Sequence, residues 1–248
     1  RDVQGAGMHI RRIAISVVLS GLALAFLAAL ALAVMREAPG TNTYAQLAAS
    51  WLQGRLDTAG PCFDNDCALF EGRTYIIFPP MPAVIALPFV ALFGIDFHFF
   101  VPLSLLAFAL TGLIWWRIGE RETGNERDLT ALATLLVLFA TPLAFVTVRG
   151  DHVWFFAQSW GMLFSSAAIY FALKRNALAA GLFIGMAFLC RQMTILYLPF
   201  LYVLLLDRET PLFRIDMAAI KRGFSLAAVP IVAVLIYFAY NYARFGSI

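Results

Sequence analysis

The sequence predicts an all-α membrane protein, a polytopic transmembrane helical bundle of about seven spans with a long first external loop. Of its 248 residues, 62% are hydrophobic and only 13% are charged, and the mean hydropathy is +0.81. Such a chain lacks the polar surface that a water-soluble domain needs. Apolar windows of about 20 residues, enough to cross a hydrocarbon core of about 30 Å, recur along it. We therefore expect a single transmembrane domain over residues 1–248.

The apolar windows set the expected spans. They lie at Ile13 to Met35, His98 to Trp116, Leu129 to Val148, Trp154 to Leu173, Ala177 to Leu206 and Phe224 to Tyr242. The first, residues 13–35, follows two arginines and is expected to remain as an uncleaved span. The fifth is too long for one crossing, so it suits two short helices in a hairpin. The remaining spans then occupy residues 98–248.

A proline-rich run separates the first two windows. Between Phe78 and Gly94 the chain carries Pro79, Pro80, Pro82 and Pro88. Proline removes backbone donors, and lipid cannot replace the lost hydrogen bonds. We expect this run to form interfacial helices within the external loop, residues 36–97, rather than a span.

The basic residues predict the orientation. With a cytoplasmic N-terminus, most of the 18 Lys and Arg fall in cytoplasmic segments, including residues 117–128 and 207–222. This is the distribution that the positive-inside rule describes. A crossing by the proline-rich run would place those segments on the opposite side.

The external loop gathers acids and two cysteines. Cys62 and Cys67 would form a disulfide in an oxidising compartment. A thiolate metal site would need more His or Cys ligands than this loop offers. The single buried thiol expected within the spans, Cys190, is interpreted as a small core residue. The acids of the loop are Glu37, Asp57, Asp64, Asp66, Glu71 and Asp96.

One cation, Arg191, interrupts the apolar run from 180 to 206. If residues 177–190 and 193–206 form the hairpin, Arg191 lies at its external turn. An arginine held in lipid costs about 2.5 to 3.5 kcal/mol, so this side chain should face water or an anion. Two interpretations stay open: an interfacial arginine that snorkels, or an anchor for a phosphate group.

Five stretches of the sequence form a pattern in a fixed order. They read NTYAQLAASWLQGRLD, FEGRTYIIFPPMPAVIALPFVALFG, RGDHVWFFAQ, GLFIGMAFLCRQ and YNYARFGS. Together they resemble bacterial members of the GT-C superfamily of integral-membrane glycosyltransferases, which includes protein O-mannosyltransferases and the aminoarabinose transferase of lipid A. The resemblance covers residues 41 to 247.

The resemblance implies an enzyme that moves a sugar from a polyprenyl-phosphate donor to an acceptor at the outer face of the bacterial cytoplasmic (inner) membrane. The apolar windows predict a multi-pass protein in the lipid bilayer, and the distribution of Lys and Arg predicts a cytoplasmic N-terminus. The resemblance also implies an acid in the first loop, a second acid where the third span meets the outer surface, and basic residues that hold the phosphate. Because such enzymes continue with further helices, the chain is expected to be the N-terminal part of a longer enzyme.

Candidate residues follow from this chemistry, because the acceptor hydroxyl needs a general base. The position of the expected acid, before the Y-x-x-L-A helix, holds Asn42, and an amide cannot accept a proton. The catalytic candidates are Asp66, Glu71, Glu37 and Asp151. Asp151, which is otherwise an interfacial acid paired with an arginine, is also the candidate ligand for a divalent cation, Mg²⁺ or Mn²⁺. The candidates for binding the donor phosphate are Arg191, Arg73, Arg149 and His152.

Other classes of protein remain open. A non-catalytic membrane subunit could use the same module in a larger assembly with other membrane subunits. A transporter would place ionisable residues inside its spans, and these spans are nearly free of charge. No basic nucleic-acid-binding patch or nucleotide-binding glycine motif is present, so no nucleic-acid partner is expected. Trp51 and Trp154 are typical of interfacial aromatic belts.

Overall fold

The structure, a computed structural model, describes residues 2–63, 66–206 and 216–247, with side chains from residue 17 onward. The loop acid Asp64 and part of the basic segment 207–222 lie outside the described residues. The chain is mostly helical and divides into two compact units, Arg1–Arg36 and Glu37–Ile248. Each unit is described by itself.

The first unit is one helix, α1 (Asp2–Arg36). Its segment Val17–Arg36 is apolar and 20 residues long, which at 1.5 Å per residue spans a hydrocarbon core of about 30 Å. This helix agrees with the predicted span at residues 13–35.

Two helices of the second unit are also long and apolar enough to cross a membrane: α4 (Phe100–Glu122) and α10 (Met217–Phe245). Only four of the 29 side chains of α10 are buried, and its exposed side chains include Ile231, Leu235 and Phe238. Water would oppose such an apolar surface, whereas lipid matches it. Together with α1, these are the three candidate spans within the described residues, and they indicate a protein of the lipid bilayer.

The predicted span from Leu129 to Val148 is wrong as a single helix. The structure divides it into α5 (Arg127–Phe139) and α6 (Leu143–Val148). Pro142 lies at the break, where it lacks a backbone donor and restricts the residue before it. The sequence is apolar on both sides of Pro142, so the hydropathy of the 129–148 window did not indicate that the helix is interrupted there.

The long apolar run after residue 176 folds as short helices, as predicted. Asn176 caps α8 (Ala177–Phe188) by accepting a hydrogen bond from the backbone N–H of Ala179. The chain then turns and continues as the 3₁₀ helix η1 (Gln192–Tyr197) and α9 (Leu198–Leu204). Arg191 lies in the turn, in extended backbone directly before η1.

The segment predicted as the external loop contains α2 (Thr43–Leu52), β1 (Cys67–Phe70), β2 (Arg73–Ile76) and α3 (Met81–Phe93). The antiparallel hairpin β1–β2 was not predicted, so the chain is not all-α. Its two-residue turn, Glu71 and Gly72, has positive φ at both positions, which gives the twist that such hairpins need. Helix α3, with 13 residues, is about 20 Å long and too short to cross; its place at the interface stays a prediction.

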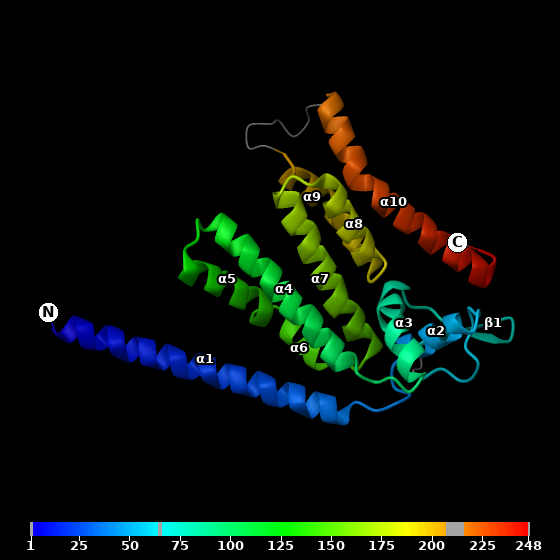
Figure 1. Cartoon of the computed structure of the whole chain (residues 1–248), viewed down its shortest axis with the longest axis horizontal. Helices are drawn as coiled ribbons and strands as arrows, with labels where there is room; N and C mark the ends of the chain where they lie inside the picture. Colours follow the sequence, from blue (N-terminus) through cyan, green and yellow to red (C-terminus); the bar gives the residue numbers. More distant parts are fainter. Residues whose placement is uncertain (1, 64–65, 207–215, 248) are drawn as a thin grey trace. The chain divides into compact units, whose positions relative to one another are not determined.

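Within the second unit the helices pack as neighbours in the order α5, α4, α7 (Val153–Leu173), α8 and α10 (Figure 1). Helices α8 and α10 approach each other closely at Gly181. A Cβ on Gly181 would lie 2.3 Å from the carbonyl oxygen of Leu226. Pro230, four residues further along α10, cannot donate to that carbonyl. Glycine therefore lets α8 pack against a backbone group that proline leaves without its helical partner.

Candidate functional site

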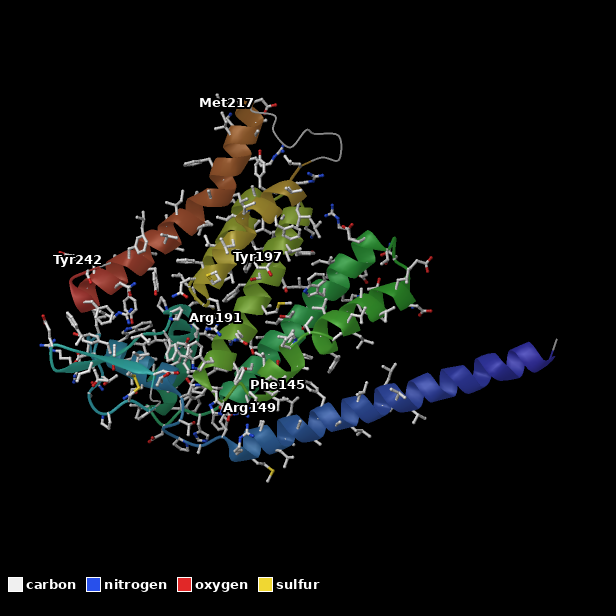
Figure 2. All side chains as sticks on the ribbon, turned by 180° about the vertical axis from the view of Figure 1, so that it is seen from behind. Phe145, Arg149, Arg191, Tyr197, Met217 and Tyr242 are labelled. Atoms are coloured by element: carbon white, nitrogen blue, oxygen red, sulfur yellow. A yellow bond between two sulfur atoms is a disulfide. The ribbon has the colours of Figure 1, made fainter. Side chains whose placement is uncertain are left out.

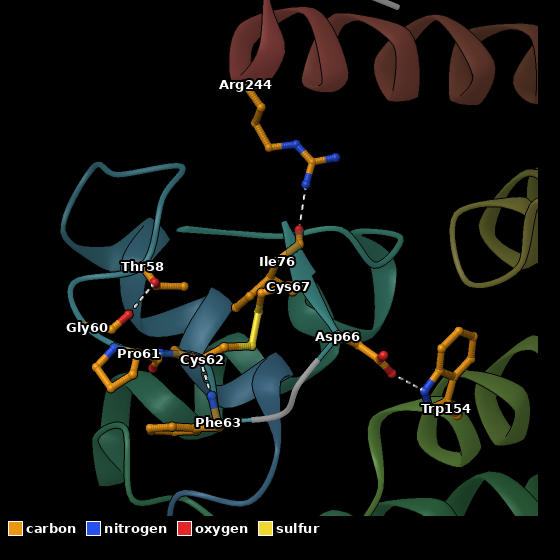
Figure 3. Close-up of a disulfide and its surroundings, with 11 residues drawn as sticks. Thr58, Gly60, Pro61, Cys62, Phe63, Asp66, Cys67, Ile76, Trp154 and Arg244 are labelled. Carbon is orange, nitrogen blue, oxygen red and sulfur yellow. Dashed lines mark hydrogen bonds between the residues drawn. A yellow bond between two sulfur atoms is a disulfide. The ribbon is translucent and has the colours of Figure 1, made fainter. Parts of the chain in front are cut away.

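Three residues that are distant in the sequence meet at the first turn of α7. The indole nitrogen of Trp154 donates a hydrogen bond to Oδ2 of Asp66 at 2.7 Å (Figure 3). The guanidinium carbon of Arg191 lies over the same indole ring, 5.2 Å from its centroid. We call Asp66, Trp154 and Arg191 the Trp154 site.

Covalent and strand geometry fix Asp66. Cys62 and Cys67 lie at disulfide distance, with Cα atoms 6.2 Å apart, which agrees with the predicted pairing. Cys67 is the first residue of β1 and pairs with Ile76 of β2. Asp66 is therefore held between a disulfide and a strand (Figure 3).

The other two residues are positioned by packing around the turn after α8. The edge of Phe78 meets the Trp154 ring with the centroids 5.2 Å apart. The backbone N–H of Met81 donates to the carbonyl of Leu189 at 3.0 Å, which ties the start of α3 to the turn. The backbone N–H of Arg191 donates to the carbonyl of Ala187 at 2.8 Å.

The charge of Arg191 has no acidic partner in the part of the chain that the structure describes. Among the described residues, no carboxylate lies within ion-pair distance of its guanidinium. Trp154 is 43% exposed, so the site opens to the surface. Burial raises the pKa of Tyr44 well above its ordinary value, and the nearby Arg191 charge acts in the opposite direction. The guanidinium of Arg191 is therefore a cation that can attract an anion.

A second cluster of candidates lies in the turn between α6 and α7. The Arg149 guanidinium donates to the ring nitrogen Nε2 of His152 at 2.6 Å, and its Nε lies 4.0 Å from Asp151 Oδ1. The other oxygen of Asp151 lies 3.6 Å from His152 Nε2. Arg149 and Arg191 are well separated in Figure 2. The three candidates of this turn thus face one another.

Asn42 connects this turn to the start of α2. Its Nδ2 donates to the carbonyl of Asp151 at 3.0 Å, and its Oδ1 accepts from the backbone N–H of Tyr44 at 2.9 Å. The amide that replaces the expected acid therefore joins two segments and caps a helix.

Glu37 has a structural role. Its carboxylate accepts hydrogen bonds from the backbone N–H groups of Phe100 and Val101, at the first turn of α4. It is 9% exposed. A carboxylate at a helix N-terminus is stabilised in its charged form by the unpaired donors and the helix dipole, so Glu37 is a poor general base.

Glu71 and Arg73 lie at the exposed end of the β1–β2 hairpin. The positive φ of Glu71 explains this position, because it forms the tight turn. The described contacts do not bring either residue to the Trp154 site. Of the predicted site residues, the structure joins Asp66 with Arg191, and separately Asp151 with Arg149 and His152.

The described residues contain no group of three or more His, Cys, Asp or Glu side chains that could hold a metal ion. Asp151 does not fit the predicted divalent-cation site well, because Arg149 and His152 already face its two oxygens. A cation there would meet two basic groups and one carboxylate. No catalytic step is derived through a metal.

Trp154 is the member of the candidate site that sequence reasoning missed. Interpreted as a belt aromatic, it instead contacts both an acid and a base. The sequence signal is its place two residues after the polar run RGDH, at a helix start. Comparison of the chain with family profiles, with curated proteins and with solved structures found no match.

Proposed function

We propose that the protein is a membrane glycosyltransferase that takes a sugar from a polyprenyl-phosphate donor at the outer face of a bacterial inner membrane. The observation that carries this proposal is the meeting of Asp66 and Arg191 on one indole ring. A carboxylate and a cation without an acidic partner are the two groups that glycosyl transfer from a phosphate needs.

In the proposed reaction Asp66 accepts the proton of an acceptor hydroxyl. The acceptor oxygen forms a bond to the anomeric carbon while the bond from that carbon to the phosphate oxygen breaks. The electron pair of the broken bond stays on the departing polyprenyl phosphate. Arg191 stabilises the negative charge that gathers there, because its planar fork can donate two hydrogen bonds.

An apolar groove near Arg191 suits the hydrocarbon part of the donor. It lies between η1, α9 and α10, has a volume of 210 Å³, and is entirely apolar. η1 begins at Gln192, directly after Arg191. Under this proposal the hydrocarbon chain of the donor lies in the groove and its phosphate lies at Arg191. The lining residues are Ile195, Leu198, Ala227, Pro230, Ile231, Val234 and Leu235.

The test is release of undecaprenyl phosphate from a panel of undecaprenyl-phosphate sugars, with the full protein in nanodiscs and a membrane extract as acceptor source. Asp66→Asn keeps the side-chain shape but removes the base, so the rate should fall by roughly 10² to 10⁴. Glu71→Gln, a matched change of a loop acid outside the site, should leave the rate unchanged.

Equal rates for Asp66→Asn and the unmodified protein would exclude Asp66 as the base. No release from any donor in the panel, by protein that still binds undecaprenyl phosphate, would favour the non-catalytic subunit.

A further inference from the structure

A second group of buried polar side chains lies where α2 meets the end of α10. Arg244, in the last turn of α10, is only 4% exposed. Its guanidinium donates to the carbonyl of Ile76 at 2.6 Å (Figure 3) and to Oδ1 of Asn241 at 2.6 Å. Among the described residues, no carboxylate forms an ion pair with it.

Aromatic rings cover part of this cation. The guanidinium carbon lies 3.9 Å from the centroid of Tyr240 and 4.9 Å from that of Phe245. Trp51 of α2 meets the Tyr240 ring edge-on, with the centroids 6.0 Å apart. Ring faces offset some of the charge, but they accept no hydrogen bond from the in-plane edge of the guanidinium.

Three polar atoms of this cluster are buried and lack a hydrogen-bond partner: Nε of Arg244, Oη of Tyr240 and Nε1 of Trp51. Tyr240 and Trp51 are close enough to interact, but their polar atoms do not reach hydrogen-bond geometry. Each of the three atoms can donate a hydrogen bond.

Unpaired buried donors lower the stability of the folded state. A buried charge without a counter-charge costs more. Water could accept the hydrogen bonds, but it would leave the charge of Arg244 uncompensated. An anion would satisfy both needs, and an oxyanion with three terminal oxygens offers an acceptor to every donor.

We propose that Arg244, Trp51 and Tyr240 form a binding site for a phosphoryl group. The group belongs either to inorganic phosphate or to the headgroup of a phosphate-monoester lipid. The inference does not rest on the proposed function, because none of these three residues belongs to the Trp154 site.

The test is thermal unfolding of the full protein in maltoside micelles without phosphate. Inorganic phosphate and phosphatidic acid are titrated separately, and sodium chloride at equal ionic strength is the control. Tyr240→Phe and Trp51→Phe each remove one unpaired donor and keep a ring. Tyr242→Phe changes a tyrosine of the same helix that is 63% exposed and serves as the matched control, together with Arg191→Ala.

We expect phosphate or phosphatidic acid, and not chloride, to raise the unfolding midpoint of the unmodified protein, of Tyr242→Phe and of Arg191→Ala. Tyr240→Phe and Trp51→Phe should need at least about tenfold more ligand for the same rise. Without ligand their midpoints should be unchanged or higher, because an unpaired buried group has been removed. A response to phosphatidic acid alone identifies a lipid, and a response to inorganic phosphate identifies a soluble anion.

The proposal is overturned if neither ligand moves the midpoint of the unmodified protein. It is also overturned if both Phe variants respond like the unmodified protein. Loss of the response in Arg191→Ala alone would assign the anion to the Trp154 site instead.

Discussion

The turn between α6 and α7 and the turn between α8 and η1 each carry an arginine, but the two arginines have different surroundings. Arg149 faces Asp151 and His152 within its own turn. Arg191 faces an indole ring, and Asp66 is hydrogen-bonded to the nitrogen of that ring. The first turn compensates its own charge, whereas the second leaves a cation available.

The difference shows why the local sequence of a turn is a weak guide to binding. Both arginines stand beside apolar helices, and both were candidates for holding phosphate. The acidic partner of Arg149, Asp151, is two residues away, so the local sequence already indicated that this charge would be compensated. The environment of Arg191 is formed by segments before residue 80 and after residue 150, and only the folded chain brings them together.

The first prediction concerns the packing of the two turns. A Cβ on Gly150 would lie 2.2 Å from Oγ and 2.6 Å from Cβ of buried Ser104. Gly150→Ala should therefore destabilise the protein by about 1 to 3 kcal/mol. A Cβ on Gly161 would lie 3.6 Å from Cβ of Cys190 and 3.7 Å from Cγ of Arg191, which is ordinary contact.

Gly161→Ala should be neutral or stabilising, by up to about 1 kcal/mol, because it replaces a helical glycine. Thermal unfolding in detergent measures both variants. Similar midpoints for the two would show that the first turn is less tightly packed than we infer.

The second prediction compares the arginines directly through binding of undecaprenyl phosphate in nanodiscs. Arg191→Ala should weaken binding by roughly 10- to 150-fold, the loss of a charge-assisted contact of about 1.5 to 3 kcal/mol. Arg191→Lys should weaken it less, because it keeps the charge without the planar fork. Arg149→Ala is the matched control and should change binding by less than about twofold. Equal losses for the two alanine variants would remove the distinction between the turns.

The third prediction separates the two contacts of Trp154. Trp154→Phe keeps an aromatic face for Arg191 but removes the N–H that holds Asp66. Sugar release should fall about tenfold, the value of one hydrogen bond to a charged group, while binding of undecaprenyl phosphate changes less. Phe155→Leu, which alters the ring beside Arg149, should affect neither quantity. If binding and release fell together in Trp154→Phe, the indole would act mainly on Arg191.

The smallest effect is expected for a compensated pair in the segment between α2 and β1. The hydrogen bond from Arg55 lowers the pKa of the Asp57 carboxyl, and burial acts against this shift. A lowered pKa means that the pair stabilises the fold above the ordinary carboxyl pKa of about 3.9, and that this contribution is lost as the pH falls below it. Between pH 7 and pH 3, Asp57→Asn should lose slightly less stability than the unmodified protein. A larger loss in Asp57→Asn would contradict the assignment.

Composition and apolar window length were sufficient to predict a helical protein of the bilayer, the first span, and the short helices around Arg191. They could not predict the break at Pro142, because the windows on both sides remain apolar. The β1–β2 hairpin was also not predicted, because strands of four residues contain too few alternating positions to establish a period of two.

The candidate site was predictable only in part. The placement of charges identified Asp66 and Arg191 separately, but the sequence around each residue does not indicate which residue it contacts in the fold. Glu37 was assigned to chemistry because sequence distance from α4 concealed the backbone donors that it caps. The site is a tertiary contact across long separations, and residue type alone does not encode such contacts.

The bond from Arg244 to Ile76 has a consequence for biosynthesis. It joins residues 168 positions apart, so the ribosome has released β2 long before α10 exists. Until α10 is inserted, the hairpin that follows Asp66 lacks this clamp, and a nascent chain presents it loosely to proteases and chaperones. Insertion of α10 therefore completes the helix packing and fixes the hairpin. This hydrogen bond accordingly forms late in the maturation of the protein.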